Sequence, residues 1–203
     1  MKAINLFNKW VDLGKDEGME TNHNASVTHM LSLLPDSILS SEFRFLDIGC
    51  GNGWVVRRMS IHKNCISAVG LDGAKKMIKK ATLHDSKSTY LEYDINNLKT
   101  YKAQFNIVFS MELMYYLANP EEVIRYIFSD LLMPGGHLVI GLDHYLENSA
   151  SLNWPNDLGV HMHTYSISKW RKILKQAGLK NMSVSQFGAK TDWSGTLILY
   201  GQK

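Results

Sequence analysis

A short apolar segment that runs into three alternating glycines, residues 45–54 (FLDIGCGNGW), constrains this chain more than any other feature. Four of the six residues at 43–48 are apolar, as in a strand that is buried on both faces. The glycines let the backbone turn sharply and approach a ligand that a Cβ atom would obstruct. From Trp54 onward the apolar residues take a helical spacing. A strand, a glycine loop and a helix in this order predict a ligand site at the carboxyl end of a parallel strand.

The glycine spacing indicates the kind of ligand. Dinucleotide sites use G-x-G-x-x-G, in which the third glycine allows close helix packing. Here the order is Asp47-x-Gly49-x-Gly51-x-Gly53. The carboxylate would repel a pyrophosphate but can bind an ammonium group, directly or through a water. The motif resembles the first motif of the class I S-adenosylmethionine-dependent methyltransferases, and the resemblance implies that it surrounds the methionine part of S-adenosylmethionine (SAM).

A second acidic residue follows at the end of the next predicted strand. Residues 65–72 form an apolar run that ends at Asp72, which lies 19 residues after Gly53 (72 − 53). This offset is close to the roughly 20 residues at which an acidic residue accepts hydrogen bonds from ribose hydroxyls. Asp72 is therefore expected to bind the cofactor ribose.

A third acid, Asp94, ends the predicted strand at residues 90–95. The family resemblance implies that Asp94 accepts a hydrogen bond from the adenine amino group and that Ile95 packs against the ring. Alternatively, Asp94 caps the turn through Asn96 and Asn97. The other candidate cofactor contacts are Cys50, Asn52, Gly73, Ser110 and Met111.

Strands and helices alternate over residues 43–141, which predicts a doubly wound parallel sheet. The later strands are expected at 105–110, after the Leu-x-Pro-Gly-Gly turn within 132–141, at 184–187 and at 196–200. The family resemblance implies that the last two form an antiparallel hairpin. The expected fold is an α/β, Rossmann-like, seven-stranded sheet, mostly parallel with a C-terminal antiparallel hairpin, over residues 41–203.

Residues 1–40 are expected to form an N-terminal helical extension of two helices joined by the polar stretch 14–23. In many small-molecule methyltransferases a helical extension here closes over the cofactor, and the resemblance suggests such a lid. Alternatively, Trp10 and Met30 are ordinary core residues, while Glu20 and His23 belong to a solvated loop. The sequence leaves both interpretations open.

Composition excludes several classes of protein. A net charge of +3 does not by itself indicate a nucleic-acid partner, and the lysines of residues 75–80 are interpreted as a solvated helix face. Two cysteines form no disulfide framework or metal ligand set, which favours a reducing compartment. No signal peptide or membrane-spanning run is recognised, so a cytoplasmic protein without a membrane partner is expected.

Methyl transfer from a sulfonium needs chiefly alignment of the acceptor and exclusion of water, so no catalytic triad is required. A base is useful where the acceptor must lose a proton. Most candidates lie in the stretch 142–165, which is expected to be irregular. The candidate catalytic residues are Tyr115, Tyr116, His144, His161 and His163.

Catechol-type relatives in the wider family place a metal-binding aspartate after strand four. Because this chain has Ser110, Met111 and Glu112 there, no catalytic metal is expected.

These patterns predict a SAM-dependent methyltransferase that acts on a small organic acceptor by in-line displacement. One alternative is a methyltransferase of RNA or protein, for which the lysines of residues 75–80 are the only indication. Another is an NAD-dependent oxidoreductase, which the glycine spacing and Asp47 oppose. The sequence identifies neither the acceptor atom nor the oligomeric state.

Overall fold

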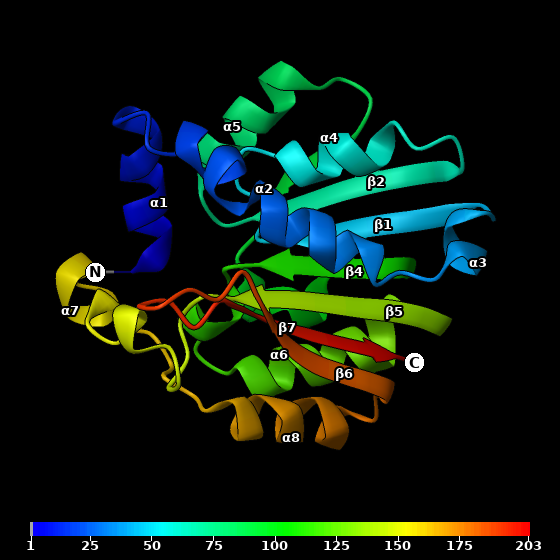
Figure 1. Cartoon of the computed structure of the whole chain (residues 1–203). Coiled ribbons are helices and arrows are strands. Elements are labelled where there is room, and N and C mark those ends of the chain that lie inside the picture. Colours follow the sequence, from blue (N-terminus) through cyan, green and yellow to red (C-terminus); the bar gives the residue numbers. More distant parts are fainter. Residues whose placement is uncertain (1) are drawn as a thin grey trace.

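The seven strands form one sheet, in the order β3-β2-β1-β4-β5-β7-β6 (Figure 1). The computed structural model describes residues 2–203; Met1, the first residue of the predicted 1–40 extension, lies outside them. The strands are β1 (Phe43–Ile48), β2 (Cys65–Asp72), β3 (Thr89–Glu92), β4 (Phe105–Met111), β5 (Leu132–Leu142), β6 (Lys180–Phe187) and β7 (Thr196–Gln202). Strands β1 to β5 pair in parallel, whereas β7 pairs antiparallel with β5 and β6. The predicted fold class is confirmed.

Helices cover both faces of the sheet (Figure 1). They are α1 (Ala3–Asp12), α2 (Glu17–Ser32), α3 (Asp36–Leu39), α4 (Trp54–Ser60), α5 (Lys75–His84), α6 (Pro120–Tyr126), α7 (Trp154–Leu158) and α8 (Ile167–Ala177), with the short turns η1 (Ile95–Thr100), η2 (Met114–Tyr116), η3 (Ile127–Leu131) and η4 (Ser149–Ser151). Because successive strand residues face opposite sides, Phe45 packs with α2 and α4 whereas Leu46 belongs to the core beneath α6 and α8. No helix of residues 2–203 has the length and apolar character needed to cross a bilayer.

The structure differs from the sequence-based expectations in two segments near the strand ends. Strand β3 stops at Glu92, so that Asp94 follows the strand as the N-cap residue of η1, which begins at Ile95. The stretch 142–165, expected to be irregular, contains η4 and α7. Pro155 in the first turn of α7 and Gly159 at its end (φ 60°) are ordinary start and stop signals, which the shortness of this helix concealed.

The polar stretch 14–23 is mostly helix rather than a loop. Helix α2 begins at Glu17, and the connection to α1 spans only residues 13–16, where Gly14 has a left-handed φ of 66°. Acidic residues in the first turn of α2 complement the partial positive charge of a helix amino terminus. Met19 and His23 therefore lie one helical turn apart on the same face of α2.

Two lysines of α5 form ion pairs with acids of the N-terminal segment; Lys76 stays exposed, as expected of a solvated face, whereas Lys80 is partly buried. Lys76 lies 2.6 Å from Asp12 at the end of α1. Lys80 lies 2.8 Å from Asp16 and 3.1 Å from Glu17. Asp16 is fully buried, and it also accepts a hydrogen bond from Asn52 of the glycine loop at 3.3 Å. The start of α2 is thus anchored to both the glycine loop and α5.

Lys80→Met should loosen the start of α2. The substitution leaves the carboxylate of Asp16 buried without its cation, at a cost of about 2 kcal/mol once partial exposure of the lysine is allowed for. We expect amide hydrogen exchange in the first turns of α2 to accelerate roughly 30-fold. Lys79→Met, at an exposed lysine of the same helix, is the matched control, and equal exchange in the two variants would contradict the anchoring role.

Candidate active site

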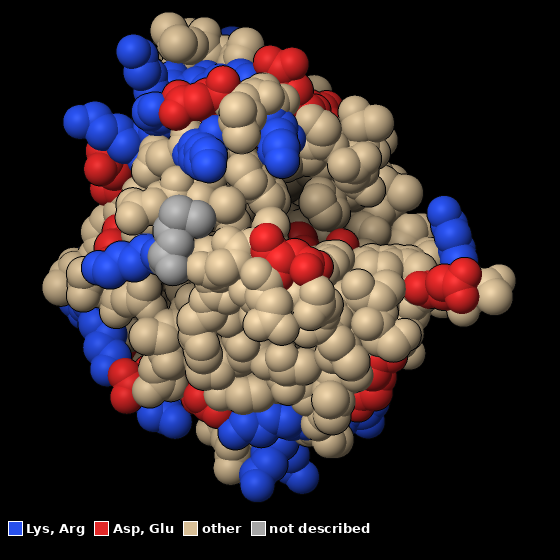
Figure 2. Space-filling view, turned by 90° about the vertical axis from the view of Figure 1, so that its left-hand side faces the viewer, with Lys and Arg blue, Asp and Glu red and all other residues tan. Residues whose placement is uncertain are grey.

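A cavity of about 1070 Å³ opens at the carboxyl ends of the parallel strands. Its walls come from the loops after β1, β2, β3 and β4, together with α1, α2 and the segment around α7. Figure 2 faces this end of the sheet and shows the hollow, with acidic side chains visible inside it and along its rim. The cavity lies where open α/β sheets bind their ligands.

The glycines after β1 have different roles. Gly49, Gly51 and Gly53 all have left-handed φ angles, 81°, 53° and 80°. A Cβ atom on Gly49 would lie 2.9 Å from the Leu113 side chain, and one on Gly53 would lie 2.5 Å from the Tyr90 ring. A Cβ on Gly51 would meet only a methionine methyl group, at 3.6 Å. Gly51 is therefore the position at which the absent side chain leaves room in the cavity.

Asp72 connects the glycine loop to the cavity. Its carboxylate accepts hydrogen bonds from the backbone N–H groups of Gly51, at 2.9 Å, and Ala74, at 2.7 Å. The side chain also lines the cavity, and burial raises its pKa. Asp47 is only 2% exposed and does not line the cavity; burial and the neighbouring Asp72 raise its pKa well above the usual range.

Asp94 lies at the cavity and caps a turn at the same time. One oxygen of its carboxylate accepts a hydrogen bond from the Asn96 N–H at 3.0 Å, as the capping interpretation expects, while the contact with adenine stays a prediction. Among the other cofactor candidates, Gly73, Ile95 and Met111 also line the cavity. The candidates that do not line it are Cys50, Asn52, Gly53 and Ser110.

The structure brings three of the five catalytic candidates to the cavity: Tyr115, Tyr116 and His161. His144 lies outside its lining, fully buried, with its ring nitrogens 2.9 Å from the Ser151 carbonyl and 2.9 Å from the Thr164 hydroxyl. Burial lowers the pKa of His144. His163 also lies outside the lining.

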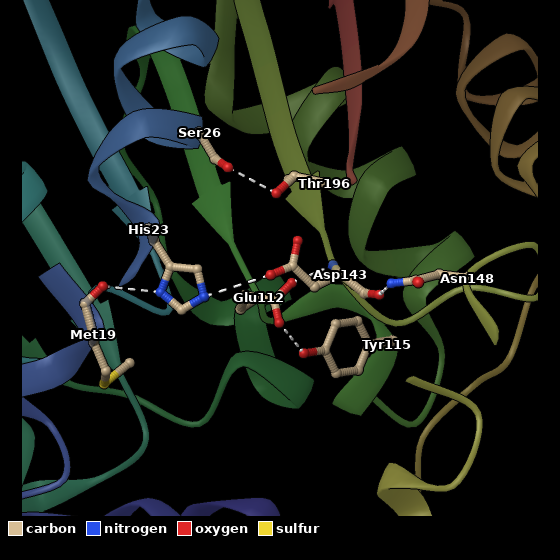
Figure 3. Close-up of polar contacts among 8 residues, drawn as sticks. All are labelled: Met19, His23, Ser26, Glu112, Tyr115, Asp143, Asn148 and Thr196. Carbon is tan, nitrogen blue, oxygen red and sulfur yellow. Dashed lines mark hydrogen bonds and ion pairs between the residues drawn. The ribbon is translucent and has the colours of Figure 1, made fainter. Parts of the chain in front are cut away.

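Sequence reasoning missed a cluster of three residues, His23, Glu112 and Asp143, which we call the histidine–carboxylate cluster. One potential ligand atom from each lies within 4.8 Å of those of the other two. His23 comes from α2, Glu112 directly follows β4 and Asp143 directly follows β5. The Nε2 atom of His23 lies 3.6 Å from Asp143 Oδ2, and its Nδ1 atom lies 2.9 Å from the Met19 carbonyl (Figure 3).

Glu112 is held in a strained, half-buried position. Its φ of 59° is left-handed, a conformation that non-glycine residues keep only where the surroundings impose it. The hydroxyl of Tyr115 and the backbone N–H of Asp143 donate hydrogen bonds to its two oxygens. Burial, and next the charge of Asp143, raise the pKa of Glu112 to about 8. Asp72 was identified in the sequence because it is an acidic residue at the end of a predicted strand. The same criterion applied to the residues that follow β4 and β5 would have found Glu112 and Asp143.

Comparison with known families identifies this arrangement of fold and cavity. A model of the methyltransferase domain matches residues 8–184 of the chain. The chain belongs to this methyltransferase family. The family predicted from the sequence is thereby confirmed, and the match also includes most of the N-terminal helices.

Several individual proteins resemble this methyltransferase. The ubiquinone biosynthesis O-methyltransferase of Chromobacterium violaceum is 29% identical over 66% of the chain and 58% of the relative. The 27-O-demethylrifamycin SV methyltransferase of Amycolatopsis mediterranei is 28% identical over 74% of the chain and 60% of the relative. The chain therefore spans about three-fifths of the length of these curated relatives.

Solved structures share the fold along nearly the whole chain. A putative methyltransferase from Haloferax volcanii, solved in complex with the Trm112 methyltransferase activator, superposes with a TM-score of 0.82 at 25% identity and covers 97% of this chain and 96% of its own. A possible histamine N-methyltransferase from Thermotoga maritima has a TM-score of 0.75 at 16% identity, with 98% of each chain covered. At this lower identity the likeness concerns the fold alone.

The cavity fits SAM, the methyl donor of methyltransferases of this fold. Gly51 leaves space beside the loop, and the same cavity is lined by Asp72, at the end of β2, and Asp94, just after β3. The volume of about 1070 Å³ slightly exceeds the roughly 300–1,000 Å³ that small-molecule sites occupy. The site thus has room for a second small molecule beside the cofactor.

Proposed function

We propose that this methyltransferase transfers the methyl group of SAM to a small organic acceptor. The observation that carries the proposal is a single cavity lined both by cofactor candidates, Gly51, Asp72 and Asp94, and by the aromatic side chains of Phe7 and Tyr116. Bound SAM supplies a methyl group on a sulfonium, already activated for displacement. The protein has to hold the acceptor in line and keep water out.

The N-terminal helices favour a small acceptor over a macromolecule. Phe7 of α1 packs edge-on against Tyr116 at 5.4 Å between ring centroids, so that α1 forms one wall of the cavity. Trp154 of α7 and Trp10 of α1 add further aromatic lining. The lysines that suggested a nucleic-acid partner do not support one, because Lys76 and Lys80 pair with acids of the N-terminal segment. An enclosed aromatic wall suits an apolar molecule of modest size.

Isothermal titration of the purified protein with SAM, S-adenosylhomocysteine (SAH) and NAD in parallel tests the cofactor. We expect micromolar binding of SAM and SAH and no binding of NAD, because the glycine spacing and acids suit the amino-acid end and ribose of SAM. Turnover is then measured as SAH formation with a panel of small amines, phenols, thiols and acids. Binding of NAD alone, or methylation of RNA or protein but of no member of the panel, would contradict the proposal.

A further inference from the structure

The histidine–carboxylate cluster provides hydrogen-bond acceptors at the cavity. His23 and Glu112 line the cavity, and Asp143 stands against His23 with 6% of its surface exposed. The Oδ1 atom of Asp143 is buried and has no hydrogen-bond partner in the protein. Because the three potential ligand atoms lie within 4.8 Å of one another, a nitrogen placed among them lies at most about 2.8 Å from each, a hydrogen-bond distance.

Each member of the cluster can accept a proton or a hydrogen bond. The Nδ1–H of His23 donates to the Met19 carbonyl, so that in the neutral ring the lone pair is on Nε2, toward Asp143. Burial lowers the pKa of His23, but Asp143 and Glu112 raise it more, so that the pKa lies above its ordinary value. Glu112 and Asp143 contribute carboxylates. No lysine or arginine of residues 2–203 forms an ion pair with either carboxylate.

Asp143 is buried and Glu112 is half-buried, and neither has a permanent cation, which is unusual because charges removed from water are normally paired. His23 is the only ion-pair partner that the described residues give to Asp143, and at 3.6 Å it is charged only when protonated. The raised pKa of Glu112, caused by burial and by Asp143, reflects the same shortage of positive charge. The cluster is thus suited to a ligand that brings a positive charge and several N–H donors.

We propose that the methyl acceptor is a primary or secondary amine whose nitrogen binds among His23, Glu112 and Asp143. The inference rests on the function proposed above and names the substrate class. An alkylammonium group brings the missing charge and at least two N–H donors, whereas an alcohol brings one donor and no charge. The aromatic side chains of Phe7, Tyr116 and Trp154 in the same cavity favour an amine attached to an apolar or aromatic body.

The cluster can also remove the proton that an ammonium group must lose before its nitrogen can react. Nε2 of His23 takes one N–H proton, and the resulting imidazolium is stabilised by Asp143 at 3.6 Å. The freed nitrogen lone pair forms the new C–N bond to the methyl carbon as the C–S bond breaks and its electron pair stays on sulfur. The products are SAH and the N-methylated ammonium ion, whose charge Glu112 and Asp143 continue to offset.

Matched amine and alcohol probes test the substrate class. Benzylamine and phenethylamine are compared with benzyl alcohol and 2-phenylethanol, first for binding to the SAH-saturated protein by titration and then for SAH formation from SAM. We expect each amine to bind at least 10-fold more tightly than its alcohol, and methylation of amines only. Glu112→Gln and Asp143→Asn should each weaken amine binding at least 10-fold, whereas Glu20→Gln, which removes an exposed acid of α2, should not.

The outcomes separate this inference from the proposed function. If SAH binds but no amine is preferred over its alcohol, or if Glu112→Gln binds amines as the parent protein does, the amine assignment is wrong and the methyltransferase proposal stands. If SAH and SAM do not bind, both are wrong. If a chelator abolishes acceptor turnover and Mg²⁺ or Zn²⁺ restores it through Glu112, the cluster is a metal site and the amine assignment is overturned.

Discussion

Asp72→Ala is expected to weaken SAM binding about 100-fold, on the order of 3 kcal/mol, while the protein remains folded. Asp72 lines the cavity, and its carboxylate also accepts hydrogen bonds from the N–H groups of Gly51 and Ala74. The substitution therefore removes the ribose acceptor and releases the glycine loop that borders the cofactor space. The measurement is a titration with SAM, accompanied by thermal unfolding to verify that the variant is folded.

Asp72→Asn separates these two contributions. Its side-chain oxygen can replace one of the two backbone contacts, and its NH₂ group cannot accept a bond from the other N–H or from a ribose hydroxyl. We expect a loss of about 10-fold for this variant, between the parent protein and Asp72→Ala. A folded Asp72→Ala protein that binds SAM as tightly as the parent would disprove the ribose assignment.

Gly51→Val is expected to abolish SAM binding, with a loss of at least about 100-fold. The Cβ position of Gly51 faces open space, with only the end of the Met19 side chain at 3.6 Å, so a valine side chain would occupy the volume that the cofactor needs. The backbone φ of 53° adds strain for a β-branched residue. Titration with SAM measures the loss.

Gly188→Val controls for this strain. Gly188 has a left-handed φ of 73°, nothing lies within 4 Å of its Cβ position, and it is not part of the cavity lining. We expect this variant to lose a similar stability, about 1–2 kcal/mol, and to keep its affinity for SAM. If both valine variants bind SAM equally, the space beside Gly51 is not where the cofactor lies.

Prediction from the sequence succeeded where the signal is local. Residues 45–54 carry both the period of a buried strand and the glycines that turn it, and the structure places β1, the loop and α4 there. Prediction from the sequence failed where the partner of a residue lies far away along the chain. The interpretation of the α5 lysines as solvated holds for the exposed Lys76 but was wrong for the partly buried Lys80, and it did not include their acidic partners, which lie 64 residues away in the sequence (76 − 12 and 80 − 16).

The candidate site shows the same contrast between local signals and contacts over long sequence separations. Asp72 was found because its distance from the glycine loop is a fixed property of a β-α-β unit. His23 was left as either lid or loop, since the sequence does not show which face of α2 turns toward the sheet. Its Asp143 partner is separated from it by 120 residues (143 − 23), and no periodicity extends over that distance.

The sequence by itself determined the order of strands and helices, the glycine loop with its acids and the methyltransferase family, because each depends on spacings within about 30 residues. Only the tertiary structure decided which groups lie together where the cavity borders the ends of β4 and β5. Parallel strands bring their carboxyl ends to one edge of the sheet whatever their separation in the chain, and α2 then packs over that edge. That packing places His23 beside the residues that follow β4 and β5, and so creates a cluster that no single segment contains.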